Sequence, residues 1–148
     1  MSDRPLSDDV RALQVIWLAI VAGALLAVAV LWWLASQADA PPMAEGGDRL
    51  FFINAAVNIG AIVAGFTLQR MLPVRVAAAE TETGAMNQVR TFGLLSIAVM
   101  EGSALLAGVA AFLTGNALNL AFVVPFLAFA ALFFPSDDRV ASLMRHLN

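Results

Sequence analysis

Glu101 is the residue in this sequence best suited to chemistry. It is the only charged side chain between Arg90 and Asp137, in a stretch that is otherwise apolar. A carboxyl group near the centre of a bilayer is costly, so it is rarely found there without a partner or a task. Desolvation disfavours its charged form, and a neutral carboxyl can donate one hydrogen bond and accept others. If water reaches it, the same group can exchange a proton or bind a cation.

Two asparagines are the candidate partners of Glu101. Asn54 and Asn58 lie one helical turn apart in the preceding apolar run, where a polar pair is unusual. Glu101 lies roughly 16 Å beyond Arg90 along a helix, and Asn58 is predicted to reach a similar depth in an antiparallel neighbour. Glu101, Asn58 and Asn54 are therefore the candidate ion-binding residues. The sequence predicts no catalytic residue and no metal ligand.

Pro125 lies near the middle of the last apolar run and is expected to kink that helix. Because proline lacks an N–H and clashes one turn back, the carbonyl of Ala121 is predicted to be free. This carbonyl could meet Glu101 and Asn58 near the midplane. Two alternatives remain open: Glu101 is a neutral hydrogen-bonding staple between helices, or it belongs to a pocket for a polar ligand.

The elements that position these residues follow from composition. Of the 148 residues, 61% are hydrophobic and 13% are charged, which departs from soluble domains in both respects. A bilayer core of about 30 Å takes roughly 20 helical residues. Four runs are long enough, at about 13–35, 50–70, 89–114 and 117–134. The sequence predicts one all-α integral membrane domain over residues 1–148, a four-helix bundle with short amphipathic helices at its ends.

Local signals predict where these helices end. Pro73 should end the second helix, which leaves a polar loop over residues 71–88 with a flexible centre at Thr81–Gly84. Ser7 and Ser136 are predicted to cap terminal surface helices, the second at about 137–147. An apolar stripe suited to a membrane surface or a partner runs along that last helix, through Val140, Leu143, Met144 and Leu147.

Small residues are expected to bring the helices together. Glu101 belongs to a stripe that also holds Gly93, Ile97, Ala104 and Gly108, which we expect to face the second helix. Asn116 and Asn119 are expected at the outer mouth without a special role. The predicted packing residues are Gly60, Gly65, Ala104 and Gly108.

The arginines predict the orientation of the chain. With four spans, one side of the membrane holds all of the arginines except Arg49, and the rule that basic residues stay inside makes that side cytoplasmic. We therefore expect a multi-pass protein of the cell inner membrane with both termini in the cytoplasm. The cytoplasmic arginines would be Arg4, Arg11, Arg70, Arg75, Arg90, Arg139 and Arg145.

Composition also excludes several classes of function. Without cysteine there is no disulfide, no thiolate metal site and no cysteine nucleophile. A net charge of −3 without a basic run gives no footprint for nucleic acid. His146 is expected to be a solvated terminal residue. We expect neither an enzyme nor a cofactor, because the sequence offers no nucleophile–base pair and no metal cluster.

Part of the chain resembles a known family. Arg90-Thr91, the run from Ile97 to Glu101, and Ala104-Leu105 resemble the outer helix of the rotary ATPase proteolipid, subunit c of ATP synthase. The resemblance covers the second and third runs, about a third to a half of the chain. It implies ion binding at Glu101 in a homo-oligomeric ring.

Two functions follow as expectations. The first is a small oligomeric membrane protein that binds or translocates protons or a cation through Glu101. The alternative is a non-catalytic structural or assembly subunit of a larger membrane complex, in which Glu101 is the neutral staple. In either case the expected partners are the lipid bilayer and other copies or subunits.

Overall fold

A computed structural model describes residues 6–43 and 47–145, and this part of the chain is helical without a strand. Three of its helices are long and apolar enough to cross a membrane: α1, α2 and α3. The elements in order are α1 (Leu6–Gln37), α2 (Gly47–Ala77), α3 (Glu82–Thr114), the 3-10 helix η2 (Ala117–Phe122), α4 (Val123–Leu132) and α5 (Asp137–Met144).

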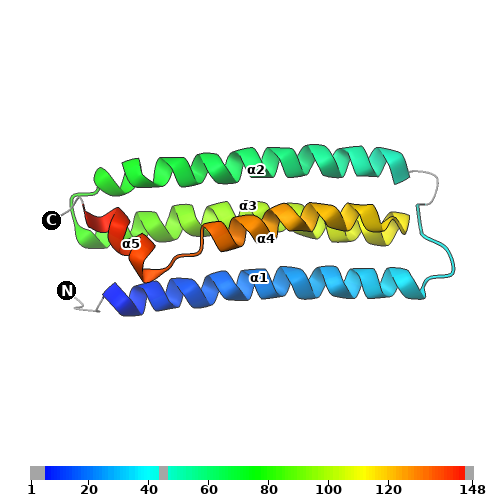
Figure 1. Ribbon diagram of the computed structural model, residues 1–148, viewed down its shortest axis with the longest axis horizontal. Coiled ribbons are helices and arrows are strands. Elements are labelled where there is room, and N and C mark those ends of the chain that lie inside the picture. Colours follow the sequence, from blue (N-terminus) through cyan, green and yellow to red (C-terminus); the bar gives the residue numbers. More distant parts are fainter. Residues whose placement is uncertain (1–5, 44–46, 146–148) are drawn as a thin grey trace.

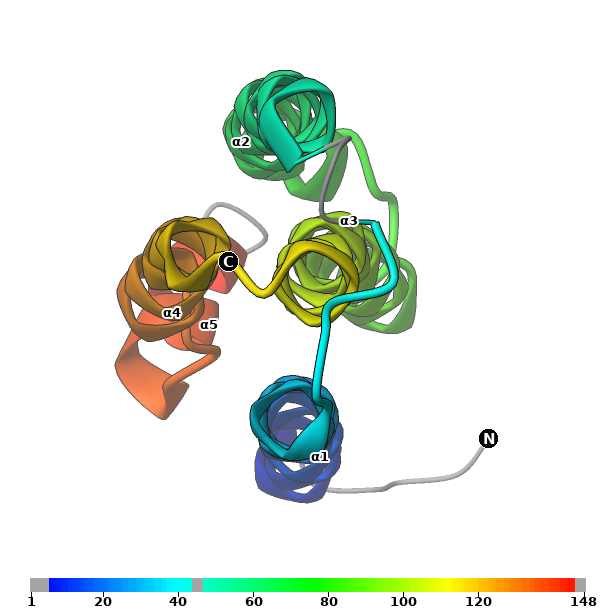
Figure 2. The same ribbon diagram turned by 90° about the vertical axis from the view of Figure 1, so that its right-hand side faces the viewer.

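The long helices lie side by side, and α3 is the central element (Figure 1). Seen from the end, α3 lies between α2 and α1, with α4 and α5 together on a third side (Figure 2). No helix of the described chain covers the fourth side of α3. This open side decides which residues of α3 reach the surface of the bundle.

The predicted last span at 117–134 is not one α-helix. It consists of η2 followed by α4, and the chain then bends by 63° into α5. Because Pro125 has no N–H, an α-helical bond to Ala121 is impossible, and the turns before it take the tighter 3-10 form. Six 3-10 and ten α-helical residues still extend about 27 Å. A fourth crossing is thus possible by length, but as a broken helix.

The prediction that Pro73 ends the second helix was wrong, because α2 continues to Ala77. Near a helix end, proline removes one hydrogen bond, and the burial of Leu72 and Val76 against neighbouring helices offsets that loss. The predicted loop at 71–88 shrinks to residues 78–81.

The predicted flexible centre at Thr81–Gly84 is instead the start of α3. Thr81 is its N-cap, and its hydroxyl accepts a hydrogen bond from the N–H of Gly84 at 3.1 Å. The sequence signal was therefore a helix cap rather than a loop.

At the other end, α1 begins at Leu6, so Ser7 lies inside it and no separate surface helix precedes the first span. The predicted cap at Ser136 is confirmed, since its hydroxyl accepts from the N–H of Arg139 at 3.3 Å.

The apolar stripe of α5 faces the bundle rather than the membrane surface. Val140 and Met144 are buried in a cluster with residues of α1, α2 and α3, and Leu143 packs against that cluster. Leu147 and His146 lie outside the described residues. The stripe thus closes one end of the bundle.

Two glycines allow close helix packing. A Cβ atom on Gly108 would lie 3.3 Å from the Cα of Val28 in α1, and one on Gly65 would lie 3.2 Å from Met100 and 3.1 Å from Phe129. Ala104 is fully buried. Gly60, in contrast, is exposed, and a Cβ there would meet nothing within 4 Å. Gly60 therefore takes no part in packing within the bundle.

Candidate functional site

Glu101 lies about halfway along α3, and its side chain is neither buried nor fully exposed. Its neighbours Ala98 and Gly102 on α3 are exposed. Among the described residues, its carboxyl takes part in no ion pair and no hydrogen bond, and neither oxygen is a buried atom without a partner. The carboxyl therefore reaches the flank of the bundle.

The stripe that carries Glu101 faces α1, not α2 as predicted. A Cβ atom on Gly93 would lie 4.0 Å from Trp17, and one on Gly108 would lie 3.1 Å from Val28, both in α1. Ser103 lies about 200° further around α3 and faces α2. The predicted contact between Glu101 and Asn58 is therefore absent. Asn58 of α2 packs against one side of α3, and the Glu101 side chain projects from another side.

The two asparagines of α2 instead form a fully buried amide cluster with Asn119. Asn58 Nδ2 donates to the side-chain oxygen of Asn54 at 2.9 Å and to its main-chain oxygen at 3.0 Å. Asn54 Nδ2 donates to Asn119 Oδ1 at 3.0 Å, and Asn119 Nδ2 donates to Thr114 Oγ1 at 3.3 Å. These bonds form a chain from the Gly115 turn toward the middle of the bundle.

The hydrogen bonds between these side chains all run in one direction, because each amide donates to the next residue nearer the turn between α3 and η2. At the inner end of the cluster, Asn58 Oδ1 is buried without a hydrogen-bond partner in the described structure. Asn58 Nδ2 also lies 3.5 Å from the main-chain oxygen of Ser103. Asn58 of α2 therefore lies at the same level along the bundle as Ser103 of α3. The cluster contains no charged residue. Its hydrogen bonds connect α2, α3 and η2.

Asn119 was not predicted to have a role, although its position in an apolar run was a usable signal. Helical spacing could not place it, because η2 turns with about three residues rather than 3.6. Asn116 caps η2, since its side chain accepts from the N–H of Leu118 at 2.9 Å.

The predicted free carbonyl of Ala121 is not available in the core. Its oxygen accepts from the N–H of Val123, and Ala121 itself is exposed. Pro125 lies in the first turn of α4, where a missing N–H costs no hydrogen bond within that helix. The proline therefore divides η2 from α4 and supplies no ligand to Glu101.

A second polar layer, which the sequence analysis missed, lies toward α5. Gln69 of α2 is buried and donates to Ser96 Oγ of α3 at 2.7 Å. Arg139 of α5 donates to Gln69 Oε1 at 3.3 Å. The signal was present in the sequence, since Gln69 continues the spacing of Asn54, Asn58, Ala61 and Gly65 by one more turn.

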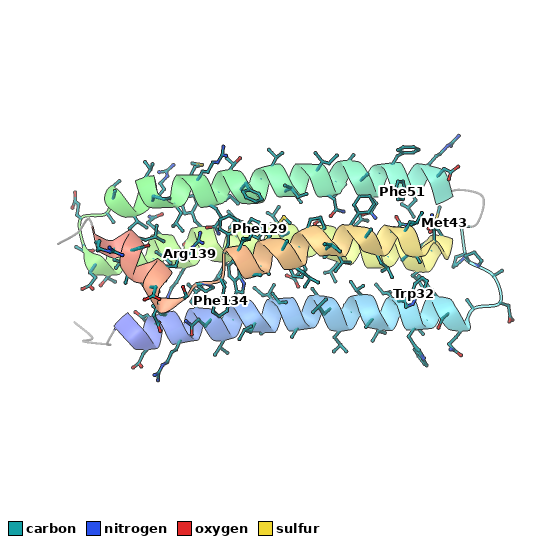
Figure 3. All side chains as sticks on the ribbon, viewed as in Figure 1. Trp32, Met43, Phe51, Phe129, Phe134 and Arg139 are labelled. Carbon is teal, nitrogen blue, oxygen red and sulfur yellow. The ribbon has the colours of Figure 1, made fainter. Side chains whose placement is uncertain are left out.

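Arg139 also donates to the main-chain oxygen of Leu132 at 3.0 Å, and its guanidinium lies 4.8 Å from the ring centre of Phe133. Partial burial desolvates this charge and lowers the pKa of Arg139 from its ordinary value. Arginine stays protonated in proteins nonetheless. Figure 3 shows Arg139 at the α5 end of the bundle, opposite the end that holds Trp32 and Met43.

The two polar layers do not join. Asn58 and Gln69 are eleven residues apart on α2, about 16 Å along the helix. Between them the core is apolar and tightly packed by Ala61, Met100, Phe126 and Phe129. Within residues 6–43 and 47–145, no three His, Asp or Glu side chains come together to hold a metal ion. One copy therefore lacks a continuous polar path along its described core.

Comparison with models of protein families, with curated proteins and with solved structures gives no match. Function is therefore inferred from the chemistry of the site itself.

Proposed function

We propose that this chain is a four-pass protein of the cytoplasmic membrane that assembles with further copies of itself through the flank of α3 that carries Glu101. The observation that carries the proposal is the carboxyl of Glu101, which lies at mid-helix, is only partly buried, and has no partner in its own described chain. Such a group in a bilayer requires a polar partner, and assembly supplies one.

The arginines support the orientation. Arg11 in α1, the pair Arg70 and Arg75 in α2, and Arg90 in α3 all lie toward the end where α5 packs, whereas Arg49 lies at the opposite end. Under the positive-inside rule, the α5 end faces the cytoplasm. The fourth crossing is supported by η2 and α4, whose six and ten residues extend about 27 Å together.

The chemistry of Glu101 favours a second copy as its partner. All copies insert with the same orientation, so each Glu101 finds the Glu101 of another copy at its own depth. Two neutral carboxyl groups are complementary, because each offers one donor and one acceptor. In a two-fold pair this gives two hydrogen bonds that no lipid tail can replace, each worth about 0.6–2 kcal/mol in membrane proteins.

The surroundings of Glu101 allow such a contact. Ala98 and Gly102 flank the carboxyl and are exposed, and a Cβ on Gly102 would meet nothing within 4 Å of its own chain. Small residues permit two helix backbones to approach closely. The α3 helices of two copies can therefore pack directly at the level of the carboxyl.

The test is the oligomeric state in mild detergent, measured by light scattering for the wild type, Glu101→Gln and Glu101→Leu. The wild type should be oligomeric. Glu101→Gln should remain so, because an amide also donates and accepts, whereas Glu101→Leu should dissociate. A monomeric wild type, or an unchanged assembly of Glu101→Leu, would refute the proposal.

Proton or cation carriage by the same carboxyl is the second candidate, because Glu101 is reachable from the side of the bundle rather than enclosed in it. Carbodiimide reacts with a protonated carboxyl that it can reach. Labelling of Glu101 that is slowed by sodium or high pH, together with loss of ion flux in assembled Glu101→Gln, would favour carriage. If neither sodium nor high pH slows the labelling and assembly is normal, the only role left for Glu101 is contact between copies.

A further inference from the structure

Arg139 carries a charge that the described chain does not balance. The one ion pair among residues 6–43 and 47–145 joins Arg90 to Asp9, so no carboxylate of these residues lies within 4.0 Å of Arg139. Its two hydrogen bonds go to neutral oxygens, of Leu132 and Gln69. Because a guanidinium has five N–H donors, Arg139 retains donors for a further acceptor.

Arg139 lies at the edge of a small cavity of about 20 Å³, which has room for little more than one water molecule. The pocket lies between α1, α2, α3 and the chain around α5, and its walls are largely apolar. Arg139 and Gln69 are its polar members, and Leu13, Trp17, Leu72 and Phe133 line it as well. Arg139 itself is only partly buried, so its guanidinium is reachable from outside the bundle.

The depth of Arg139 in the membrane indicates which kind of anion could bind to it. Its bond to Gln69 sets it at the level of the last turns of α2, toward the end of the bundle that our orientation places in the cytoplasmic leaflet. Phosphate groups of lipids lie at this depth, and basic pockets between membrane helices bind such headgroups. Asp137 and Asp138 precede Arg139 in α5 but are exposed and make no ion pair with it.

We propose that Arg139, supported by Gln69, binds the phosphate of an anionic ligand at the mouth of this pocket, with a phospholipid headgroup as the natural source. The guanidinium presents its unused donors to the phosphate oxygens in the paired geometry that arginine favours. The assignment does not depend on the role of Glu101.

The test measures thermal unfolding of delipidated protein in neutral detergent, titrated with phosphatidylglycerol, phosphatidylcholine or inorganic phosphate. Phosphatidylglycerol should stabilise the wild type in a saturable manner, and Arg139→Gln should weaken its apparent affinity at least about tenfold. Arg139→Lys should lose less, because it keeps the charge. Arg145→Gln, at the C-cap of α5, is the matched control and should bind as the wild type does.

Stabilisation by inorganic phosphate that also requires Arg139 would support the site with a soluble ligand, whereas a response to phosphatidylglycerol alone would assign it to lipid. If Arg139→Gln does not fold, the comparison of Arg139→Lys with Arg145→Gln carries the test. Equal affinity of the wild type and the Arg139 variants, or an equal loss in Arg145→Gln, would overturn the proposal.

Discussion

Replacement of Asn54 by leucine tests whether the buried amide cluster exists as described. Asn54 is fully buried and lies at the centre of the chain of amides. The substitution removes two side-chain hydrogen bonds, one from Asn58 at 2.9 Å and one to Asn119 at 3.0 Å. Leucine has a similar size, so packing changes less than polarity.

The expected magnitude follows from the groups left behind. Asn58 Nδ2 keeps the main-chain oxygen of Asn54, but Asn119 Oδ1 loses its donor. Hydrogen bonds between membrane helices contribute about 0.6 kcal/mol on average and rarely more than about 1.7 kcal/mol. An unsatisfied buried acceptor costs about 1–3 kcal/mol. We expect Asn54→Leu to lower the free energy of unfolding by about 1–2 kcal/mol.

The assay is reversible unfolding in mixed micelles with increasing dodecyl sulfate, followed by circular dichroism. A double-mutant cycle with Asn119→Leu isolates the bond between the two side chains and should give a coupling energy of about 0.5–1.5 kcal/mol. The control is Thr67→Val, an exposed residue of α2 that bonds within its own helix. Unchanged stability of Asn54→Leu, or zero coupling with Asn119→Leu, would refute the cluster.

Three further predictions concern packing, an ion pair and a cap. Gly108→Val should lower stability by about 1–3 kcal/mol because its side chain would overlap α1, while Gly60→Val should have little effect; equal effects would contradict the packing. Asp9→Asn should cost about 0.2–1 kcal/mol at low salt and less at high salt, because it breaks the half-buried pair with Arg90; a salt-independent cost would argue against the pair. Thr81→Ala should lower stability by about 0.5–2 kcal/mol and Thr81→Ser should restore it; a silent Thr81→Ala would dispute the cap.

Depth could be predicted from the sequence, because it follows from residue counts along straight helices. Asn58 contacts Ser103, two residues from Glu101, so the level expected for this part of α2 was close. The neighbouring helix that each face of α3 contacts could not be predicted in the same way. The small-residue stripe of α3 suits either neighbour, and only the three-dimensional arrangement assigns it to α1.

Local signals failed where tertiary packing outweighed them. Pro73 lies inside α2 because Leu72 and Val76 are buried on either side of it. Asn119 joined the cluster because η2 changes the helical period before Pro125. Gln69, by contrast, could have been found by extending the spacing of Asn54 and Asn58 along the same face.

Cysteine cross-linking in native membranes tests the central claim, contact between copies at the Glu101 flank, most directly. The chain has no cysteine, so each introduced thiol is unique. Ala98 is exposed on α3 about one turn from Glu101, and Ala98→Cys is the test variant. The control is Ile59→Cys, at a position 63% exposed on α2. We predict a disulfide-linked dimer from Ala98→Cys, its loss when Glu101→Leu is added, and none from Ile59→Cys. Equal cross-linking at both positions, or no effect of Glu101→Leu, would contradict the account.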